Sequence, residues 1–323
     1  MLEKIKAVMI GHAVGDALGV PVEFASREEV DANPVEDMEG FGTYPYPAGT
    51  WSDDTSMSVA ALDSLVKGEI DWDEIMGNFG KWLQDGDYTP SGEAFDAGRT
   101  CVRAIINYFA HNMSALESGE AAEHSNGNGS LMRIHPFALF LYTKGNLDLQ
   151  TIHNASALTH AHERSQIACG IYSFVLWELL KTPSKASIRR GLNKARIFYR
   201  DYAENSHYDN LYRRIGLIGL QFEDDPDAFH RFGREDIKSS GYVVDTIEAA
   251  IWCLMNTHSY KECVLTAVNL GDDTDTVAAI AGGLAGALYG YDAIPQEWRD
   301  TLIKREYIEE MCEKAYACWE KAI

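Results

Sequence analysis

Apolar residues recur at spacings of three and four along most of the chain, which is the pattern of helices that bury one face. Convincing runs of alternating apolar and polar residues, which would indicate strands, are absent. The helical spacing predicts helices over residues 4–20, 54–67, 72–84, 95–111, 131–142, 149–158, 163–181, 185–203, 208–220, 243–256, 259–268, 276–289, 297–303 and 307–322. We therefore expect an all-α protein.

The segments between these helices are rich in residues that stop helices and form turns. Residues 44–49 contain two Pro and one Gly, and Asn and Gly alternate over residues 126–129. No Pro-, Gly- or Ser-rich linker, low-complexity tract or repeat of fixed period divides the chain of 323 residues. The sequence therefore predicts a single domain over residues 1–323.

Two of the predicted helices carry glycines spaced four residues apart. Each glycine costs a helix on the order of 1 kcal/mol, so a stripe of three needs compensation, which close packing of two backbones would supply. If the stripes meet, Asp16 and Glu23 approach the late part of the chain. The alternative is that the glycines only mark thin places in a crowded bundle. The six positions are Gly11, Gly15, Gly19, Gly282, Gly286 and Gly290.

Two short acidic segments, 51–55 and 271–276, are the strongest chemical signal in the chain. Each places carboxylates beside hydroxyl groups and then runs into an apolar helical segment. Packed carboxylates repel one another and resist desolvation, so a fold that gathers them normally supplies a cation. The plainer alternative is that each segment only caps a helix, because acids are favoured at helix N-termini. A cap needs one acid, however, so we interpret the pair as two halves of one metal site.

The candidate ligands narrow the choice of metal. All are carboxylate or hydroxyl oxygens, without cysteine, which suits Mg²⁺, Mn²⁺ or Ca²⁺ better than zinc or copper. Four or five carboxylates exceed the needs of one such ion, so the sequence favours a two-metal site.

Composition adds expectations about partners and location. The formal net charge of −21 disfavours nonspecific nucleic-acid binding, which depends on Lys and Arg. The six cysteines lack paired spacing, as in reduced cytosolic proteins. The N-terminal segment does not read as a secretory signal, and the longest small and apolar run, 277–290, is too short to span a bilayer. We expect a cytoplasmic protein with neither membrane nor nucleic acid as partner.

Five motifs occur in the order seen in ADP-ribosylglycohydrolases, and the chain resembles this family from about residue 5 to about residue 290. The resemblance implies a compact, orthogonally packed all-α bundle with two Mg²⁺ ions, or Mn²⁺, in a cleft. It also implies removal of ADP-ribose from modified proteins or small acceptors. The motifs are Gly15-Asp16-Ala17-Leu18-Gly19 with Glu23, Ser52-Asp53-Asp54-Thr55, residues 127–133, Thr159-His160, and residues 271–276.

The resemblance also implies roles for individual residues in the two acidic segments. The family usually has Thr where this chain has Ser52, whose hydroxyl offers the same oxygen. Asp272 stands where many relatives have Gly, and we leave it out of the ligand set. The implied metal ligands are Ser52, Asp53, Asp54, Asp273, Asp275 and Thr276.

Two further acids are candidate catalytic residues. Glu23 matches the family acid that lies over the metal centre and is assigned to proton transfer or gating; otherwise it is a solvated acid at a helix end. Asp96 lies in a Phe-Asp-x-Gly segment like that of the dinitrogenase-reductase-activating branch, where the aspartate faces the scissile bond. This points to arginine-linked ADP-ribose. Asp96 is alternatively the cap of a helix that it begins.

The substrate contacts are assigned to two loops. Asn128, Gly129 and Ser130, followed by a helix predicted near residue 131, offer backbone N–H groups for a diphosphate, although such a loop is often an ordinary turn. His160 matches a family residue near the diphosphate and ribose. Tyr242 is our prediction for stacking on adenine.

We therefore expect a Mg²⁺-dependent hydrolase of the bond between ADP-ribose and an acceptor, most simply ADP-ribosyl-arginine on a protein. A non-catalytic relative that binds ADP-ribose or resembles a crystallin is the first alternative. A metal-dependent phosphoesterase is the second, since oxygen ligands alone permit it. The sequence does not specify the acceptor, the biological role or the oligomeric state.

Overall fold

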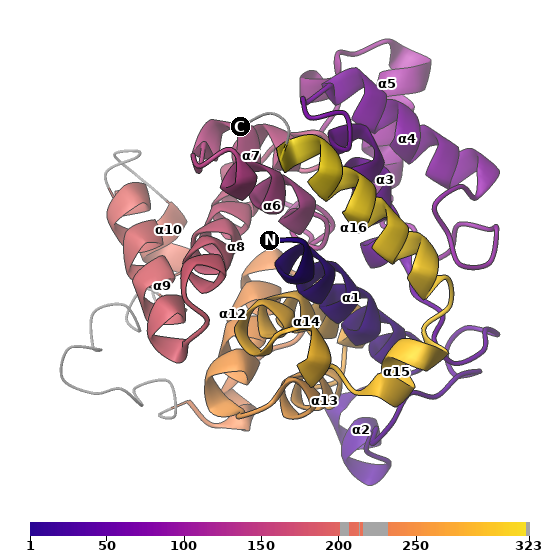
Figure 1. Ribbon diagram of the computed structural model, residues 1–323, viewed down its shortest axis with the longest axis vertical. Coiled ribbons are helices and arrows are strands. Elements are labelled where there is room, and N and C mark those ends of the chain that lie inside the picture. The colour runs from indigo at the N-terminus through magenta and orange to yellow at the C-terminus, as the bar shows by residue number, and fades with distance from the viewer. Residues whose placement is uncertain (201–206, 213, 216–231, 321–323) are drawn as a thin grey trace.

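The computed structural model describes residues 1–200, 207–212, 214–215 and 232–320. Within these ranges the regular structure is helical, with two isolated bridges (Glu120 with His160, Gly127 with Tyr242) and no strand. The all-α prediction is therefore confirmed (Figure 1). The helices are α1 (Leu2–Gly19), α2 (Arg27–Ala32), α3 (Asp53–Leu65), α4 (Trp72–Asp85), α5 (Arg99–His111), α6 (His135–Thr143), α7 (Leu149–Ala157), α8 (Glu163–Lys181), α9 (Lys185–Arg200), α10 (His207–Leu211), α12 (Val243–Asn256), α13 (Tyr260–Val268), α14 (Thr274–Tyr289), α15 (Gln296–Thr301) and α16 (Arg305–Glu320).

Most predicted helices are found with shifted ends. The helix predicted over 95–111 begins only at Arg99, because Asp96 has a left-handed backbone (φ 55°) that no helix accepts. The helix predicted over 131–142 begins at His135, after residues that form turns. Of the helix predicted over 208–220, residues 213 and 216–220 fall outside the described residues, and α10 covers its first part.

One helix was missed by the periodicity. Helix α2 has only six residues, too few for an apolar period to show. A capping box stabilises its start: Ser26 accepts a hydrogen bond from the Glu29 N–H, and the Glu29 carboxylate accepts one from the Ser26 N–H.

Helices α1 and α14 lie side by side near the centre of the molecule, and their glycine stripes face each other (Figure 1). A Cβ on Gly15 would lie 2.1 Å from the carbonyl oxygen of Ala278, and one on Gly286 would lie 1.9 Å from that of Ala7. Only glycine permits this approach, so the predicted pairing of the stripes is confirmed. Gly290 is the exception, since it is the C-cap of α14 with φ 89° and no described residue lies within 4 Å of its Cβ position.

The same packing brings distant parts of the chain together. A Cβ on Gly19 would lie 2.3 Å from the Cα of Asp275, so the end of α1 touches the start of α14. Helix α16 packs on α1 and α3, and Lys6 pairs with Glu313 at 2.6 Å. Helix α1 and the turn after it are apolar and long enough to cross a membrane, but 83% of that window is buried in the core.

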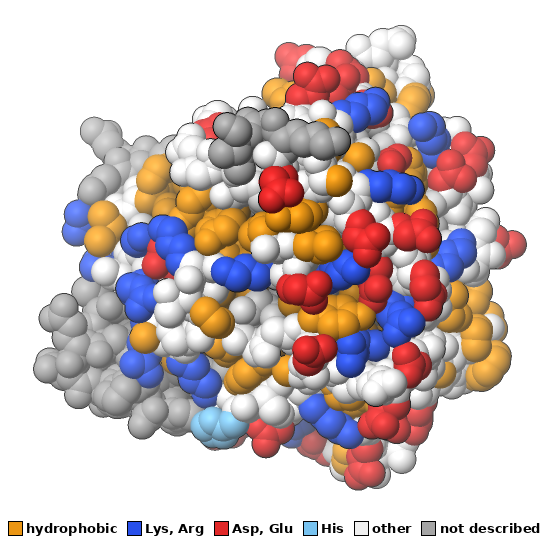
Figure 2. Space-filling view, in the orientation of Figure 1, with side chains coloured by type: hydrophobic (Ala, Val, Ile, Leu, Met, Phe, Trp, Pro, Cys, Tyr) orange, Lys and Arg blue, Asp and Glu red, His pale blue; other side chains and the backbone are white. Residues whose placement is uncertain are grey.

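Acidic residues outside the two segments are largely a surface feature. Figure 2 shows Asp and Glu side chains spread over one face of the molecule, among Lys and Arg side chains. This distribution accounts for part of the net charge of −21 without a binding site.

Candidate active site

A buried carboxylate from α1 fixes the start of α3. Asp16 accepts hydrogen bonds from the backbone N–H of Ser52 (2.9 Å) and of Thr55 (3.0 Å), and from the Thr55 hydroxyl (2.6 Å). It therefore acts as a cap supplied by a different helix. Burial raises the pKa of Asp16 to about 6, although these hydrogen bonds oppose the shift.

The two acidic segments meet at the starts of α3 and α14. Ser52 caps α3 by accepting from the Asp54 N–H (3.3 Å), and its hydroxyl also donates to the Asp54 carboxylate (3.2 Å). The Thr276 hydroxyl, on α14, donates to the same carboxylate oxygen of Asp54 at 3.2 Å. Capping and assembly thus coexist, and the predicted meeting of the two segments is confirmed.

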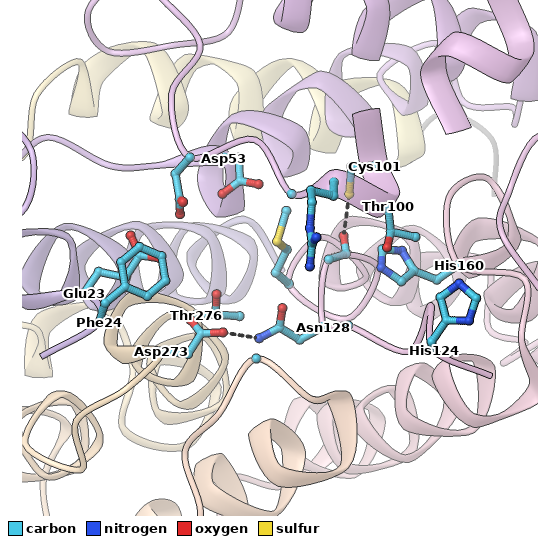
Figure 3. A pocket seen from close by; sticks show the side chains of 17 residues that line it. Glu23, Phe24, Asp53, Thr100, Cys101, His124, Asn128, His160, Asp273 and Thr276 are labelled. Atoms are coloured by element: carbon cyan, nitrogen blue, oxygen red, sulfur yellow. Dashed lines mark hydrogen bonds between the residues drawn. The ribbon is translucent and has the colours of Figure 1, made fainter. Parts of the chain in front are cut away.

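Asp273 does not cap α14 with its side chain, although it occupies the N-cap position. Its carboxylate instead accepts a hydrogen bond from the Asn128 amide at 2.7 Å. This bond ties the second acidic segment to the Gly-Asn loop of residues 127–130, as Figure 3 shows.

Three carboxylates converge beside these segments. Oxygens of Glu23, Asp96 and Asp275 lie within 4.8 Å of one another. The Tyr44 hydroxyl donates to Asp96 at 2.8 Å. The alternative interpretation of Asp96 as a helix cap is wrong, because Gly98 holds the N-cap position of α5 and Asp96 faces the other acids.

Burial dominates the electrostatics of the cluster. It raises the pKa of Glu23 to about 9, with Asp96 and Asp273 adding repulsion. Burial also raises the pKa of Asp96 to about 6. The pKa values of three fully buried acids are held well above their ordinary range by burial and then by neighbouring carboxylates. These are Asp53, Asp54 and Asp275.

The donor set fits a hard cation. Buried oxygens of Glu23, Asp54 and Asp275 (Oε2, Oδ1 and Oδ2, respectively) have no hydrogen-bond partner among the described residues. Unpartnered buried carboxylate oxygens are costly in a folded protein unless a cation binds them. Carboxylate and hydroxyl oxygens are the ligands preferred by Mg²⁺ and Mn²⁺. The residues present therefore fit the predicted metal centre.

A cavity of about 400 Å³ opens over the acids. Figure 3 shows Glu23, Phe24 and Asp53 toward one end and His160 and His124 toward the other. Asp273, Thr276 and Asn128 lie between the two ends. The cavity is thus long enough to join an acidic end to an end lined by a glycine loop and histidines.

Some of the residues predicted to contact the substrate line this cavity and others do not. Asn128, Gly129 and His160 line it. Ser130 does not, because it is fully buried and hydrogen bonds with the Ser156 hydroxyl at 2.9 Å. Tyr242 is the N-cap residue of α12. It is half-buried and does not line the cavity, and the Arg164 guanidinium lies 5.7 Å from its ring centroid. Their roles in substrate binding stay predictions.

The loop at 127–130 lacks the helix N-terminus expected behind it, since α6 starts at His135. Arg133, the charged residue of this motif, is also turned away from the cavity. It is fully buried and donates to the Ala155 carbonyl (3.0 Å) and the Thr159 hydroxyl (2.7 Å). Arg133 therefore supports the core and does not line the cavity, although its charge helps to lower the pKa of His160.

Sequence reasoning missed two side chains that the fold brings to the acids. Tyr44 lies in a segment marked only by its Pro and Gly turn signals, and Phe24 simply follows Glu23. No local pattern distinguishes them, because their contacts with the acids or the cavity depend on how residues 20–50 fold over the helix ends.

The helices surround a cleft and direct several buried carboxylates into it. The protein is therefore of the all-α class, with an oxygen-lined centre suited to hard cations. The family model described as ADP-ribosylglycohydrolase matches residues 1–322, so the chain belongs to the ADP-ribosylglycohydrolase family. Its members include ADP-ribosyl hydrolase enzymes, and the chain is an enzyme of this kind.

Named relatives and a solved structure agree with this assignment. The chain is 32% identical to the ADP-ribosylarginine hydrolase Tri1 of Serratia proteamaculans, covering 98% of this chain and 79% of that protein. It is 31% identical to the ADP-ribosyl-[dinitrogen reductase] glycohydrolase of Rhodospirillum rubrum, covering 93% and 90%. A solved structure described as an ADP-ribosylglycohydrolase-related protein complex superimposes with a TM-score of 0.79 at 28% identity over 98% of each chain. These likenesses support hydrolysis of a glycosidic bond of ADP-ribose and give no support to a phosphoesterase.

Proposed function

We propose that this protein hydrolyses the bond between ADP-ribose and an arginine side chain of a modified protein, with two Mg²⁺ ions or Mn²⁺ in the acidic centre. The observation that carries the proposal is the meeting of two distant acidic segments around buried oxygens that have no hydrogen-bond partner in the described part of the chain. Two Tri1 relatives named ADP-ribosylarginine hydrolases support the choice of arginine. The residues that hold the ions are Ser52, Asp53, Asp54, Asp273, Asp275 and Thr276.

The bound ions supply charge that holds the ribose hydroxyls and polarises water. The residues of the chain perform the proton transfers. Without a bound ion, burial raises the pKa of Glu23 to about 9 and that of Asp96 to about 6, so Glu23 holds its proton more tightly than Asp96 does. Neighbouring acids with separated pKa values are suited to act as acid and base.

In the reaction, the bond from the anomeric carbon to the guanidine nitrogen breaks, and a water oxygen bonds to that carbon. Glu23 gives its proton to the leaving guanidine nitrogen, and Asp96 takes a proton from the water. Tyr44 keeps Asp96 in position by its 2.8 Å hydrogen bond. Asp96 then passes its proton to Glu23, which returns both acids to their starting states.

The far end of the cavity binds the diphosphate. The Thr159 hydroxyl oxygen accepts from Arg133 (2.7 Å) and shares a 2.8 Å hydrogen bond with Nδ1 of His160, and we infer the tautomer in which Thr159 donates this bond. The His160 proton then resides on Nε2 and is free to donate to a phosphate oxygen. Burial lowers the pKa of His160 to about 3, so the ring acts as a neutral donor.

The proposal is tested by incubating the protein with arginine-linked and serine-linked ADP-ribosyl substrates, with Mg²⁺ or with EDTA. We expect Mg²⁺-dependent release of ADP-ribose, with arginine preferred. Asp54→Ala or Asp273→Ala should abolish release, and Glu23→Gln should slow it by roughly 10²- to 10⁴-fold. Asp85→Ala, at an exposed acid on α4, is the matched control and should behave as the wild type.

Each other outcome argues against a specific part of the proposal. Release that ignores EDTA would remove the metal centre. Tight ADP-ribose binding without turnover would favour the non-catalytic alternative. We further propose, from the six free cysteines, that the protein acts in the cytoplasm on ADP-ribosylated proteins or small conjugates.

A further inference from the structure

Phe24 is a large aromatic side chain left in solvent at the acidic end of the cavity. Its side chain is 68% exposed, and it lines the cavity directly after Glu23 (Figure 3). Its backbone is left-handed, with φ 66°. A bulky residue in this conformation is an outlier that the surrounding structure must enforce.

The enforcement comes from reciprocal backbone hydrogen bonds. The Phe24 N–H donates to the Asp272 carbonyl (2.7 Å), and the Asp272 N–H donates to the Ala25 carbonyl (2.8 Å). The Thr43 hydroxyl donates to the Glu23 carbonyl at 2.7 Å. Asp272 also has a left-handed backbone, with φ 60°. Glycine adopts this conformation easily, which fits the Gly that many relatives have at this position. The backbone of Phe24 is therefore held beside the second acidic segment.

Burial of the ring does not compensate this conformation, because most of the ring faces water. Nor does a neighbouring aromatic ring pack on it. The nearby rings of Tyr44 and Tyr46 both pack on Phe95, with centroids at 5.0 and 4.6 Å, whereas among the described residues no ring contact involves Phe24. An exposed ring fixed at the mouth of a cleft has a free face for a ligand.

We propose that Phe24 is a specificity residue whose ring stacks on the guanidinium of the arginine acceptor. The inference rests on the proposed arginine-linked substrate and adds the residue that selects it. In the proposed function ADP-ribose extends from the acids toward His160 and Asn128, which places the acceptor across the acids, at the end where Phe24 lies. A guanidinium is planar, weakly hydrated and always charged, which suits an aromatic face in the cavity that the Asp96 carboxylate also lines. A serine acceptor offers no cation to the ring.

The test compares two leucine variants in the full-length protein. Phe24→Leu keeps an apolar side chain but removes the π face. We expect it to raise the KM for ADP-ribosyl-arginine by roughly 3- to 30-fold, the range of a cation–π contact, while the Kd for free ADP-ribose stays at the wild-type value. Phe24→Trp should restore the low KM.

Phe41→Leu is the matched control. Phe41 is also left-handed (φ 60°) and 73% exposed, but it does not line the cavity. Its substitution tests the cost of replacing an exposed, left-handed phenylalanine in the same region, and should change neither KM nor Kd.

Fluorinated phenylalanines at position 24 give a readout that a merely structural role would not move. Each added fluorine weakens the negative face of the ring, so the logarithm of kcat/KM should fall steadily with fluorine number. A kcat/KM that stays constant across the series would overturn the proposal. So would a Phe24→Leu variant with the KM of the wild type. An equal loss in the Kd for ADP-ribose would also overturn it, because the ring would then contact ADP-ribose itself. If the wild type fails to cleave the arginine-linked substrate, the proposed function fails first, and the two failures are thereby distinguished.

Discussion

The carboxylates of the acidic centre lie close together and out of water, although ionised carboxylates repel one another and favour solvent. Asp53, Asp54 and Asp275 are buried together, and the pKa of each is raised by burial and by mutual repulsion. Such a cluster destabilises the ionised, metal-free protein and binds cations for the same reason. A cation bound there, as we propose, would offset this repulsion.

The metal-free protein should lose stability as the pH rises. The pKa of Glu23 is about 9 in the folded state against an ordinary 4.5, and that of Asp16 is about 6 against 3.8. The folded state therefore holds more protons than the unfolded state, and this contribution, complete below pH 4, is lost as the pH rises through 6 to 9. In EDTA, the melting temperature should fall between pH 5 and 9.

Divalent cation should reverse this loss. At a Mg²⁺ concentration of 100 times its Kd, stability should rise by about 2.7 kcal/mol, and the slope with pH should flatten. Asp54→Asn, which removes one charge at constant size, should melt higher than the wild type in EDTA yet gain less from Mg²⁺. Melting curves in EDTA that are level or rise from pH 5 to 9 would contradict this account.

At the scale of the element, helix starts and glycine stripes assemble the site. Helices α3 and α14 both aim their N-termini, with acids in the first turn, at the same cavity. The partial positive charge of each N-terminus favours carboxylates there. The glycines of α1 then let α14 approach until Gly19 reaches Asp275. Close packing of two helices is thus what joins the two acidic segments.

A pair of glycine-to-alanine substitutions tests this packing. Gly15→Ala would place a Cβ 2.1 Å from the Ala278 carbonyl oxygen, so α1 and α14 must separate, and we expect a loss of about 1–3 kcal/mol in the free energy of unfolding together with weaker Mg²⁺ binding. Gly77→Ala, in α4 with nothing within 4 Å, should instead stabilise by about 0.5–1 kcal/mol. Urea denaturation measures both. Equal effects of the two substitutions would show that the close approach has no energetic consequence.

At the scale of the whole molecule, the two ends of the chain share one core. Helix α1 packs on both α14 and α16, and α16 also packs on α3. Trp319, near the end of α16, is fully buried and donates to the Leu65 carbonyl, at the end of α3. The described residues near the two ends of the chain are thus tied into one core, and a single domain over residues 1–323 stays a prediction.

Calorimetry should therefore record one cooperative unfolding transition, with equal calorimetric and van't Hoff enthalpies. Saturating Mg²⁺ should shift this single transition upward without splitting it. Two separate transitions, with Mg²⁺ moving only one of them, would show that the core is divided and that residues 1–323 hold more than one folding unit.

The amino-acid sequence by itself determined the helical class, the glycine stripes and the oxygen chemistry of the two acidic segments, because periodicity, backbone freedom and ligand type are local properties of residues. It misplaced the start of α5, since Asp96 takes a left-handed backbone that no local pattern announces, and the start of α6, since the residues before His135 form turns. It also did not foresee Asp16 as the cap of α3, Tyr44 as the partner of Asp96, or the exposed ring of Phe24. Only the tertiary structure decided these, because each depends on contacts between segments that come together when the helices pack.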